Sequence, residues 1–257
     1  MPDDDAARDV GALARAAHAC HGCELWAEAT QVVFSRGPDD ARLALVGEQP
    51  GDREDREGEP FVGPAGRVLD DALEAAGLSP DEVYLTNAVK HFRFEQRGKR
   101  RLHKSPDVAH VRACLPWLAA EVTAVAPRIV VALGATAGRT VLGRAVRVTA
   151  ERGRLLDPGD VASGNASPLV PGAAGAPRPG SAPGVVLTTH PSALLRLRDR
   201  SGWDDAFAAL VGDLRVAADA AAGTPTDVST GASTITSTVT STDTSTNPAR
   251  DARRRPG

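Results

Sequence analysis

The sequence is poor in aromatic residues, in cysteine and in net charge. Phe, Trp and Tyr make up only 4% of the 257 residues, so Leu, Val and Ala must fill the core that a hydrophobic share of 42% supports. Three cysteines in a reducing compartment argue against a disulfide framework, although not against a metal site. A formal net charge of −3 excludes a globally basic nucleic-acid-binding protein, so binding to a polyanion would need a local basic patch.

Long apolar runs are also missing, and none approaches the length of a membrane span. The first residues, MPDDDAARDV, are acidic and lack the basic-then-apolar order of a signal peptide. We therefore expect a cytoplasmic protein that does not bind membranes.

Four short apolar, β-branched runs end at small or polar residues, which is typical of buried parallel strands. They lie at 42–48, 82–89, 128–134 and 184–190. Helical patterns lie between or beside them, at 6–19, 65–76, 106–125, 135–143 and 204–221. This alternation predicts an α/β fold, a three-layer α/β/α sandwich around a central four-stranded parallel sheet.

Two segments differ in composition from this architecture. Residues 157–184 are rich in Gly, Pro and Ala, which predicts a long flexible insertion between the third and fourth strands. Residues 222–257 are rich in Ser and Thr and contain almost no large apolar residue, which predicts a disordered tail. One domain over 1–221 therefore remains.

Polar residues gather where the expected strands end. Glu48 follows the first strand, Asn87 ends the second and His190 ends the fourth. Ligands of open α/β sheets bind beyond the carboxyl ends of the strands, so these side chains predict a site at that edge. Phe61, in the loop GEPFVGPAG, is either a cap on the core or an aromatic platform for a flat ligand.

Three motifs occur in order: VGEQPGDREDREGEPFVGPAGRVLDDAL at 46–73, LTNAVK at 85–90 and THPSALLR at 189–196. Together they resemble the motifs of the iron–sulfur (family 4) uracil-DNA glycosylases, within the uracil-DNA glycosylase superfamily. The resemblance implies the uracil-DNA glycosylase-like fold. It also implies that the partner is uracil-containing DNA, single- or double-stranded, bound by a monomer that associates with the nucleoid.

The resemblance also implies roles for the residues of the site. Phe61 would stack on uracil, and Asn87 would hydrogen-bond to O4 and N3–H. His190 would donate to O2 as negative charge develops on the departing base, and Glu48 would stabilise the oxocarbenium-like sugar. Three further residues of the motifs would shape the pocket: Gly47, Gln49 and Asp52. Ser192 would contact the DNA.

A narrower resemblance comes from Glu48-Gln49 together with the inserted loop GKRRLH at 98–103. This pair of features is similar to the UdgX branch, which becomes covalently joined to the abasic sugar through a histidine, here His103. The neighbouring cations would hold phosphates and keep the imidazole neutral: Lys99, Arg100, Arg101 and Lys104. By itself, the loop also fits a solvated basic face.

Cys20 and Cys23 form a C-x-x-C pair, and Cys114 follows much later. Three thiolates suit an iron–sulfur cluster, while zinc with a Cys₃His set is an alternative that spacing does not exclude. The related glycosylases have VVKC where this chain has AVKH. The resemblance therefore implies a structural [4Fe–4S] cluster with His91 as the fourth ligand.

Three functions are compatible with these patterns. The first is uracil excision followed by covalent trapping of the abasic deoxyribose through His103. The second is a conventional multiple-turnover iron–sulfur uracil-DNA glycosylase. The third is a non-catalytic DNA-binding module, and Glu48 and Asn87 beside Phe61 argue against it, because a plain binder does not need them.

Overall fold

The computed structural model describes residues 9–156 and 183–223, which belong to one compact unit. The expected insertion and tail lie outside the described residues, except at their edges. There, Gly184 begins a strand and Ala222 ends a helix.

Six strands form the main sheet in the order β1-β3-β2-β6-β8-β7. The four expected strands lie at its centre and pair in parallel: β3 (Tyr84–Asn87), β2 (Leu43–Gly47), β6 (Ile129–Leu133) and β8 (Gly184–Thr188). Two antiparallel edge strands make the sheet mixed, β1 (Ser35–Arg36) and β7 (Leu155–Leu156). The sheet is therefore wider than expected, because two-residue strands are too short to leave a sequence pattern.

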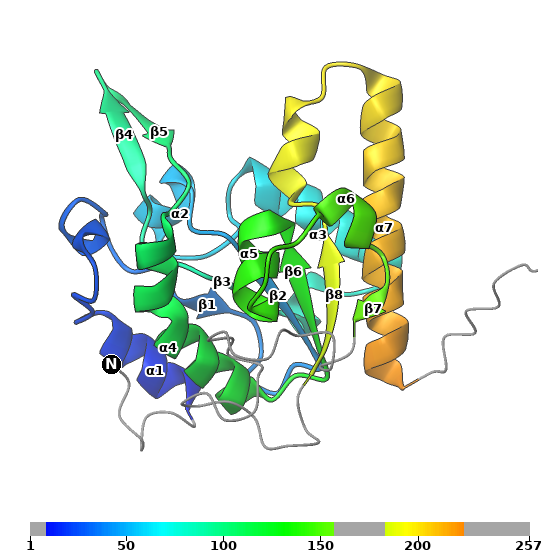
Figure 1. Cartoon of the computed structure of the whole chain (residues 1–257), viewed down its shortest axis with the longest axis horizontal. Helices are drawn as coiled ribbons and strands as arrows, with labels where there is room; N and C mark the ends of the chain where they lie inside the picture. Colours follow the sequence, from blue (N-terminus) through cyan, green and yellow to red (C-terminus); the bar gives the residue numbers. More distant parts are fainter. Residues whose placement is uncertain (1–8, 157–182, 224–257) are drawn as a thin grey trace, which may run out of the picture. The chain divides into compact units, whose positions relative to one another are not determined.

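Helices cover both faces of the sheet, which gives three layers (Figure 1). Along β2, Leu43 and Leu45 pack toward α3 (Pro64–Ala76) and α7 (Arg200–Ala222). Ala44 and Val46 pack toward α4 (Val108–Val125) and α5 (Gly134–Leu142) on the opposite face. Because successive side chains of a strand point to opposite faces, a strand buried on both must be apolar throughout, as β2 is.

Shorter elements complete the described chain: α1 (Val10–Ala17), η2 (Glu24–Ala27), α2 (Asp52–Glu57), η3 (Pro80–Glu82), α6 (Val148–Glu151) and η5 (Pro191–Arg196). The longest helix, α7, begins four residues before the pattern predicted, because the Asp199 side chain accepts a hydrogen bond from the Gly202 amide and caps it. No helix in the described ranges is long and apolar enough to cross a membrane.

The basic loop of the sequence folds into a separate antiparallel hairpin, β4 (Phe94–Arg97) and β5 (Arg100–His103). It projects from the body of the molecule (Figure 1). Gly98 occupies its turn with φ +58, a conformation that tight hairpin turns require and that glycine adopts without strain. The hairpin places His103 at its base, at the end of β5.

Candidate functional site

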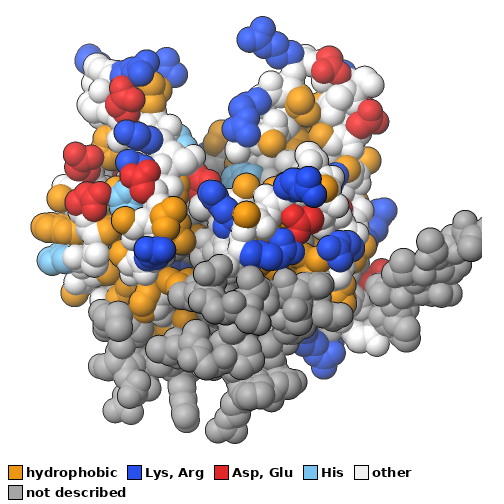
Figure 2. All heavy atoms as spheres, in the orientation of Figure 1, with side chains coloured by type: hydrophobic (Ala, Val, Ile, Leu, Met, Phe, Trp, Pro, Cys, Tyr) orange, Lys and Arg blue, Asp and Glu red, His pale blue; other side chains and the backbone are white. Residues whose placement is uncertain are grey.

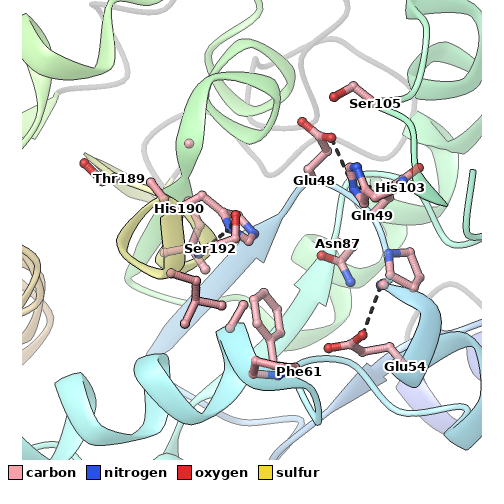
Figure 3. A pocket seen from close by; sticks show the side chains of 18 of the residues that line it. Glu48, Gln49, Glu54, Phe61, Asn87, His103, Ser105, Thr189, His190 and Ser192 are labelled. Carbon is pink, nitrogen blue, oxygen red and sulfur yellow. Dashed lines mark hydrogen bonds and ion pairs between the residues drawn. The ribbon is translucent and has the colours of Figure 1, made fainter. Parts of the chain in front are cut away.

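A pocket of about 910 Å³ opens at the carboxyl ends of the central strands. Figure 2 shows the surface hollowed between the β4–β5 hairpin and the segment around η5, with Lys and Arg side chains on both rims. Eight predicted site residues line the pocket: Glu48, Gln49, Asp52, Phe61, Asn87, His103, His190 and Ser192. The structure thus brings together residues from β2, β3, the hairpin and the end of β8 (Figure 3).

Gly47 makes room for the two residues expected to recognise a base. A Cβ atom at this position would lie 2.2 Å from Asn87 Oδ1 and 2.7 Å from Phe61 Cζ, both far inside van der Waals contact. The absence of a side chain therefore lets the amide and the ring approach the same point. Gly47 thus contributes to the pocket through the space that it leaves for the Asn87 and Phe61 side chains.

Phe61 is held in an unusual backbone conformation, with φ +60 in the left-handed region. Such strain persists only where the surroundings impose it, and it is common at functional sites. Gly66 is part of that constraint, because a Cβ there would lie 1.5 Å from the Phe61 carbonyl oxygen. Glu54 is another part, since its carboxylate accepts hydrogen bonds from the Gly51 amide at 3.1 Å and the Gly63 amide at 2.9 Å.

The role of Glu54 is not predictable from the sequence, where this residue is one of several carboxylates in the acidic run DREDRE. A buried ion pair behind Asn87 is not predictable from the sequence either; the Asn87 side chain itself is buried. The Lys90 ammonium donates to the Asn87 carbonyl at 3.0 Å and pairs with the fully buried Glu121. This buried ion pair fixes the backbone that carries the amide.

His190 faces the Phe61 ring, with a centroid separation of 6.4 Å and an interplanar angle of 27°. Burial lowers the pKa of His190 to about 4, so the imidazole is neutral at physiological pH. The Ser192 amide donates to Nδ1 at 3.1 Å, which leaves the ring proton on Nε2. Ser192, which we expected to contact DNA, has its hydroxyl 2.9 Å from the same nitrogen and orients the ring.

His103 lies beside Glu48, with 3.8 Å between its Nε2 and Glu48 Oε1 (Figure 3). Its side chain is 49% exposed, so the ring is accessible from the pocket mouth. Gln49 Nε2 lies 3.0 Å from the same ring nitrogen and 3.1 Å from the Lys104 carbonyl oxygen. The Gln49 amide oxygen accepts from the Arg93 amide at 3.2 Å, so one side chain joins both ends of the hairpin to the pocket.

Arg101 has a different role from the phosphate contact that we expected. Its guanidinium pairs with Asp52 at 2.5 Å and with the buried Asp55 at 2.6 Å, and it lies over the Phe92 and Phe94 rings. Asp52 lines the pocket, but its carboxylate is engaged in this pair. The other three cations of the loop have exposed side chains: Lys99, Arg100 and Lys104.

Of the four predicted cluster ligands, Cys23 and Cys114 lie together at one corner of the fold, and the four side chains do not form a ligating group. Cys23 and Cys114 pack with Val89, two residues before His91. A hydrogen bond with Cys114 lowers the pKa of the Cys23 thiol to about 6. Cys20 accepts a hydrogen bond from Trp117 Nε1 at 3.3 Å. Across residues 9–156 and 183–223, no three His, Cys, Asp or Glu side chains are arranged to hold a metal ion.

The donor chemistry at this corner nevertheless suits a metal centre. The lowered pKa of Cys23 favours its thiolate, the form that binds iron–sulfur clusters and structural zinc, whereas the hydrogen bond with Cys23 and burial raise the pKa of the Cys114 thiol. Burial lowers the pKa of His91, which keeps the imidazole neutral with a free lone pair. The donor types therefore suit a Cys₃His site, whereas the arrangement of these four side chains does not form one.

Two comparisons with known proteins, one with family profiles and one with individual proteins, agree with each other. The profile of the uracil DNA glycosylase superfamily matches residues 34–215. The chain is 37% identical over 139 residues to a type-4 uracil-DNA glycosylase of Thermotoga maritima, covering 54% of this chain and 69% of that protein. It is also 37% identical over 116 residues to a type-4 uracil-DNA glycosylase of Sulfurisphaera tokodaii, covering 45% of this chain. The chain spans half the length of that second relative.

Proposed function

The chain belongs to the uracil-DNA glycosylase superfamily, and we propose that it excises uracil from DNA and then bonds to the abasic sugar through His103. The observation that carries this proposal is the position of the His103 ring, 3.8 Å from the Glu48 carboxylate at the mouth of the pocket. A conventional glycosylase is the second candidate, because the relatives compared carry the name type-4 uracil-DNA glycosylase.

Binding begins with a base that leaves the stack, because its glycosidic bond cannot be reached inside a duplex. Phe61 offers a ring face, and the Asn87 amide supplies an acceptor and a donor that match N3–H and O4 of uracil. Both side chains are buried at the pocket floor, so water competes little for these contacts. Single- and double-stranded DNA can both present a base in this way.

Excision breaks the bond between C1′ and N1 of uracil, and the bonding electron pair leaves with the base. His190 carries its proton on Nε2 and can donate it in a hydrogen bond to O2 as negative charge develops there. It does so as a neutral donor, since its pKa is about 4. Glu48 stabilises the sugar cation that remains.

Capture requires a nucleophile at C1′ before water arrives. The Gln49 amide nitrogen cannot accept a hydrogen bond, so of the two neutral tautomers of His103 the one with its lone pair on Nε2 suits their 3.0 Å contact. The lone pair forms the bond to C1′, and the proton on the other ring nitrogen is then released. In the second candidate function, water attacks C1′ and the abasic DNA is free to dissociate.

DNA would be held across the hollow that contains the pocket. Lys99, Arg100 and Lys104 on the hairpin have exposed side chains and can reach backbone phosphates. The net charge of the chain is −3, so these contacts would act locally at the pocket mouth.

We also propose that Cys20, Cys23, His91 and Cys114 hold a [4Fe–4S] cluster, with zinc as the alternative occupant. When bound, the group would supply a structural cross-link between η2, the segment after β3 and α4. The pocket residues described above carry out every step of the reaction.

A denaturing gel with a uracil-containing oligonucleotide tests the proposed function. The parent protein is expected to give a shifted band that survives heat and detergent. His103→Ala is expected to give free abasic product or no shifted band. His18→Ala is the matched control, because His18 is exposed and lies outside the pocket lining. Free abasic product from the parent over many turnovers would establish the conventional glycosylase. If the parent neither excises uracil nor forms an adduct, the protein would be a non-catalytic DNA-binding module.

A further inference from the structure

The Glu48 carboxylate has a partner that does not line the pocket. The Thr136 hydroxyl donates a hydrogen bond to Glu48 Oε2 at 2.5 Å. Thr136 belongs to the first turn of α5 and is 8% exposed. The two oxygens of Glu48 thus have different surroundings, since Oε1 is the atom that lies 3.8 Å from His103.

From this contact we propose that Thr136 is a positioning residue, which sets the orientation of the Glu48 carboxylate. The inference rests on the proposed function, because it concerns how Glu48 acts on the sugar. A glutamate side chain has three rotatable bonds, and a charge-assisted hydrogen bond from a fixed donor selects one arrangement. The donor is fixed because Thr136 is β-branched and buried.

This hydrogen bond leaves one carboxylate oxygen for the reaction. Oε2 is engaged by Thr136 behind the pocket, so Oε1 is directed toward His103 and the space where C1′ would lie. The first turn of a helix also favours a nearby negative charge, and α5 has nine residues. Without the hydroxyl, the carboxylate could rotate and would be less well placed for the developing cation.

Single-turnover excision measured at several protein concentrations separates positioning from binding. Thr136→Val keeps the shape of the side chain and removes its donor. We expect its maximal rate to fall roughly 10-fold to 100-fold, as for removal of a hydrogen bond to a charged group. The concentration that gives half the maximal rate should stay close to that of the parent, because Thr136 does not line the pocket.

Two further variants distinguish this role from a structural one. Thr136→Ser retains the hydroxyl and should recover most of the excision rate. Thr140→Val removes a hydroxyl one turn later on α5, where it donates to the Thr136 carbonyl at 2.8 Å and not to Glu48, and should excise at the parental rate. If Thr136→Val does not fold by circular dichroism, the same comparison is made with Thr136→Ala.

Three results would overturn the inference. One is a Thr136→Val rate equal to that of the parent. The others are a Thr136→Ser rate as low as that of Thr136→Val, and an equal fall in rate for Thr140→Val. A parent that excises no uracil would instead contradict the proposed function.

Discussion

Arg101 Nη1 lies 2.6 Å from the Oδ2 atom of Asp55, a residue with no exposed surface in its side chain. The pair joins the β4–β5 hairpin to α2, across 46 residues of sequence. Removal of one partner would leave a buried charge without compensation, so the pair holds the hairpin against the pocket wall. His103 is therefore presented by an anchored element.

Arg101→Met should lower the yield of the covalent adduct much more than it lowers uracil excision. The hairpin would lose its anchor, so His103 would reach C1′ less often, while Glu48 and His190 would stay in place. The free energy of unfolding should fall by about 3 kcal/mol, the scale for breaking a buried ion pair. Denaturing gels and urea unfolding measure the two effects. An adduct yield equal to that of the parent would show that the anchor is not needed.

Lys99→Ala and Arg100→Ala should weaken DNA binding without changing stability. Removal of one phosphate-binding cation should reduce the slope of log K against log salt by about 0.9. Arg97→Ala is the matched control, because Arg97 lies on the same hairpin but pairs with Glu95 at 2.9 Å. Fluorescence anisotropy at several salt concentrations measures the slope. Equal slopes in the parent and all three variants would mean that neither Lys99 nor Arg100 binds a phosphate.

Gly47→Ala should abolish uracil excision while the protein remains folded. The added methyl group would collide with Asn87 Oδ1 and Phe61 Cζ and move both away from the base. Gly212→Ala is the control, because a Cβ at that helical position meets nothing within 4 Å and alanine favours a helix. Retained excision in Gly47→Ala would mean that neither contact is required.

His190 should make the protein less stable as pH falls. Its pKa is about 4 in the folded state, below the ordinary 6.5, so the unfolded chain binds the proton first. The free energy of unfolding should therefore drop by about 2 kcal/mol between pH 7 and pH 5. Urea unfolding of the parent and of His190→Gln measures this difference. An identical pH dependence in the two proteins would contradict the assignment.

The purified protein should show the broad visible absorption of an iron–sulfur cluster, and Cys114→Ser should abolish it. His21→Ala is the control, since His21 lies inside the C-x-x-C motif but outside the proposed ligand set. A colourless protein that contains zinc would establish the alternative metal. A protein without either metal would contradict the proposed site.

The four central strands and the edge of the sheet that carries Glu48, Asn87 and His190 were predictable from the sequence alone. Short apolar runs that end at polar residues encode local backbone structure, and parallel pairing then places those ends together. The motifs also singled out Phe61 and His103. These signals depend on residues close to one another in the chain.

Tertiary structure alone decided which partners the charged and polar side chains find. Arg101 was predicted to reach phosphate, yet it pairs with Asp52 and Asp55, because α2 packs against the hairpin. The hydrogen bond from Thr136 to Glu48 spans 88 residues. Sequence patterns record the preferences of neighbouring residues, whereas such contacts exist only after distant elements have packed.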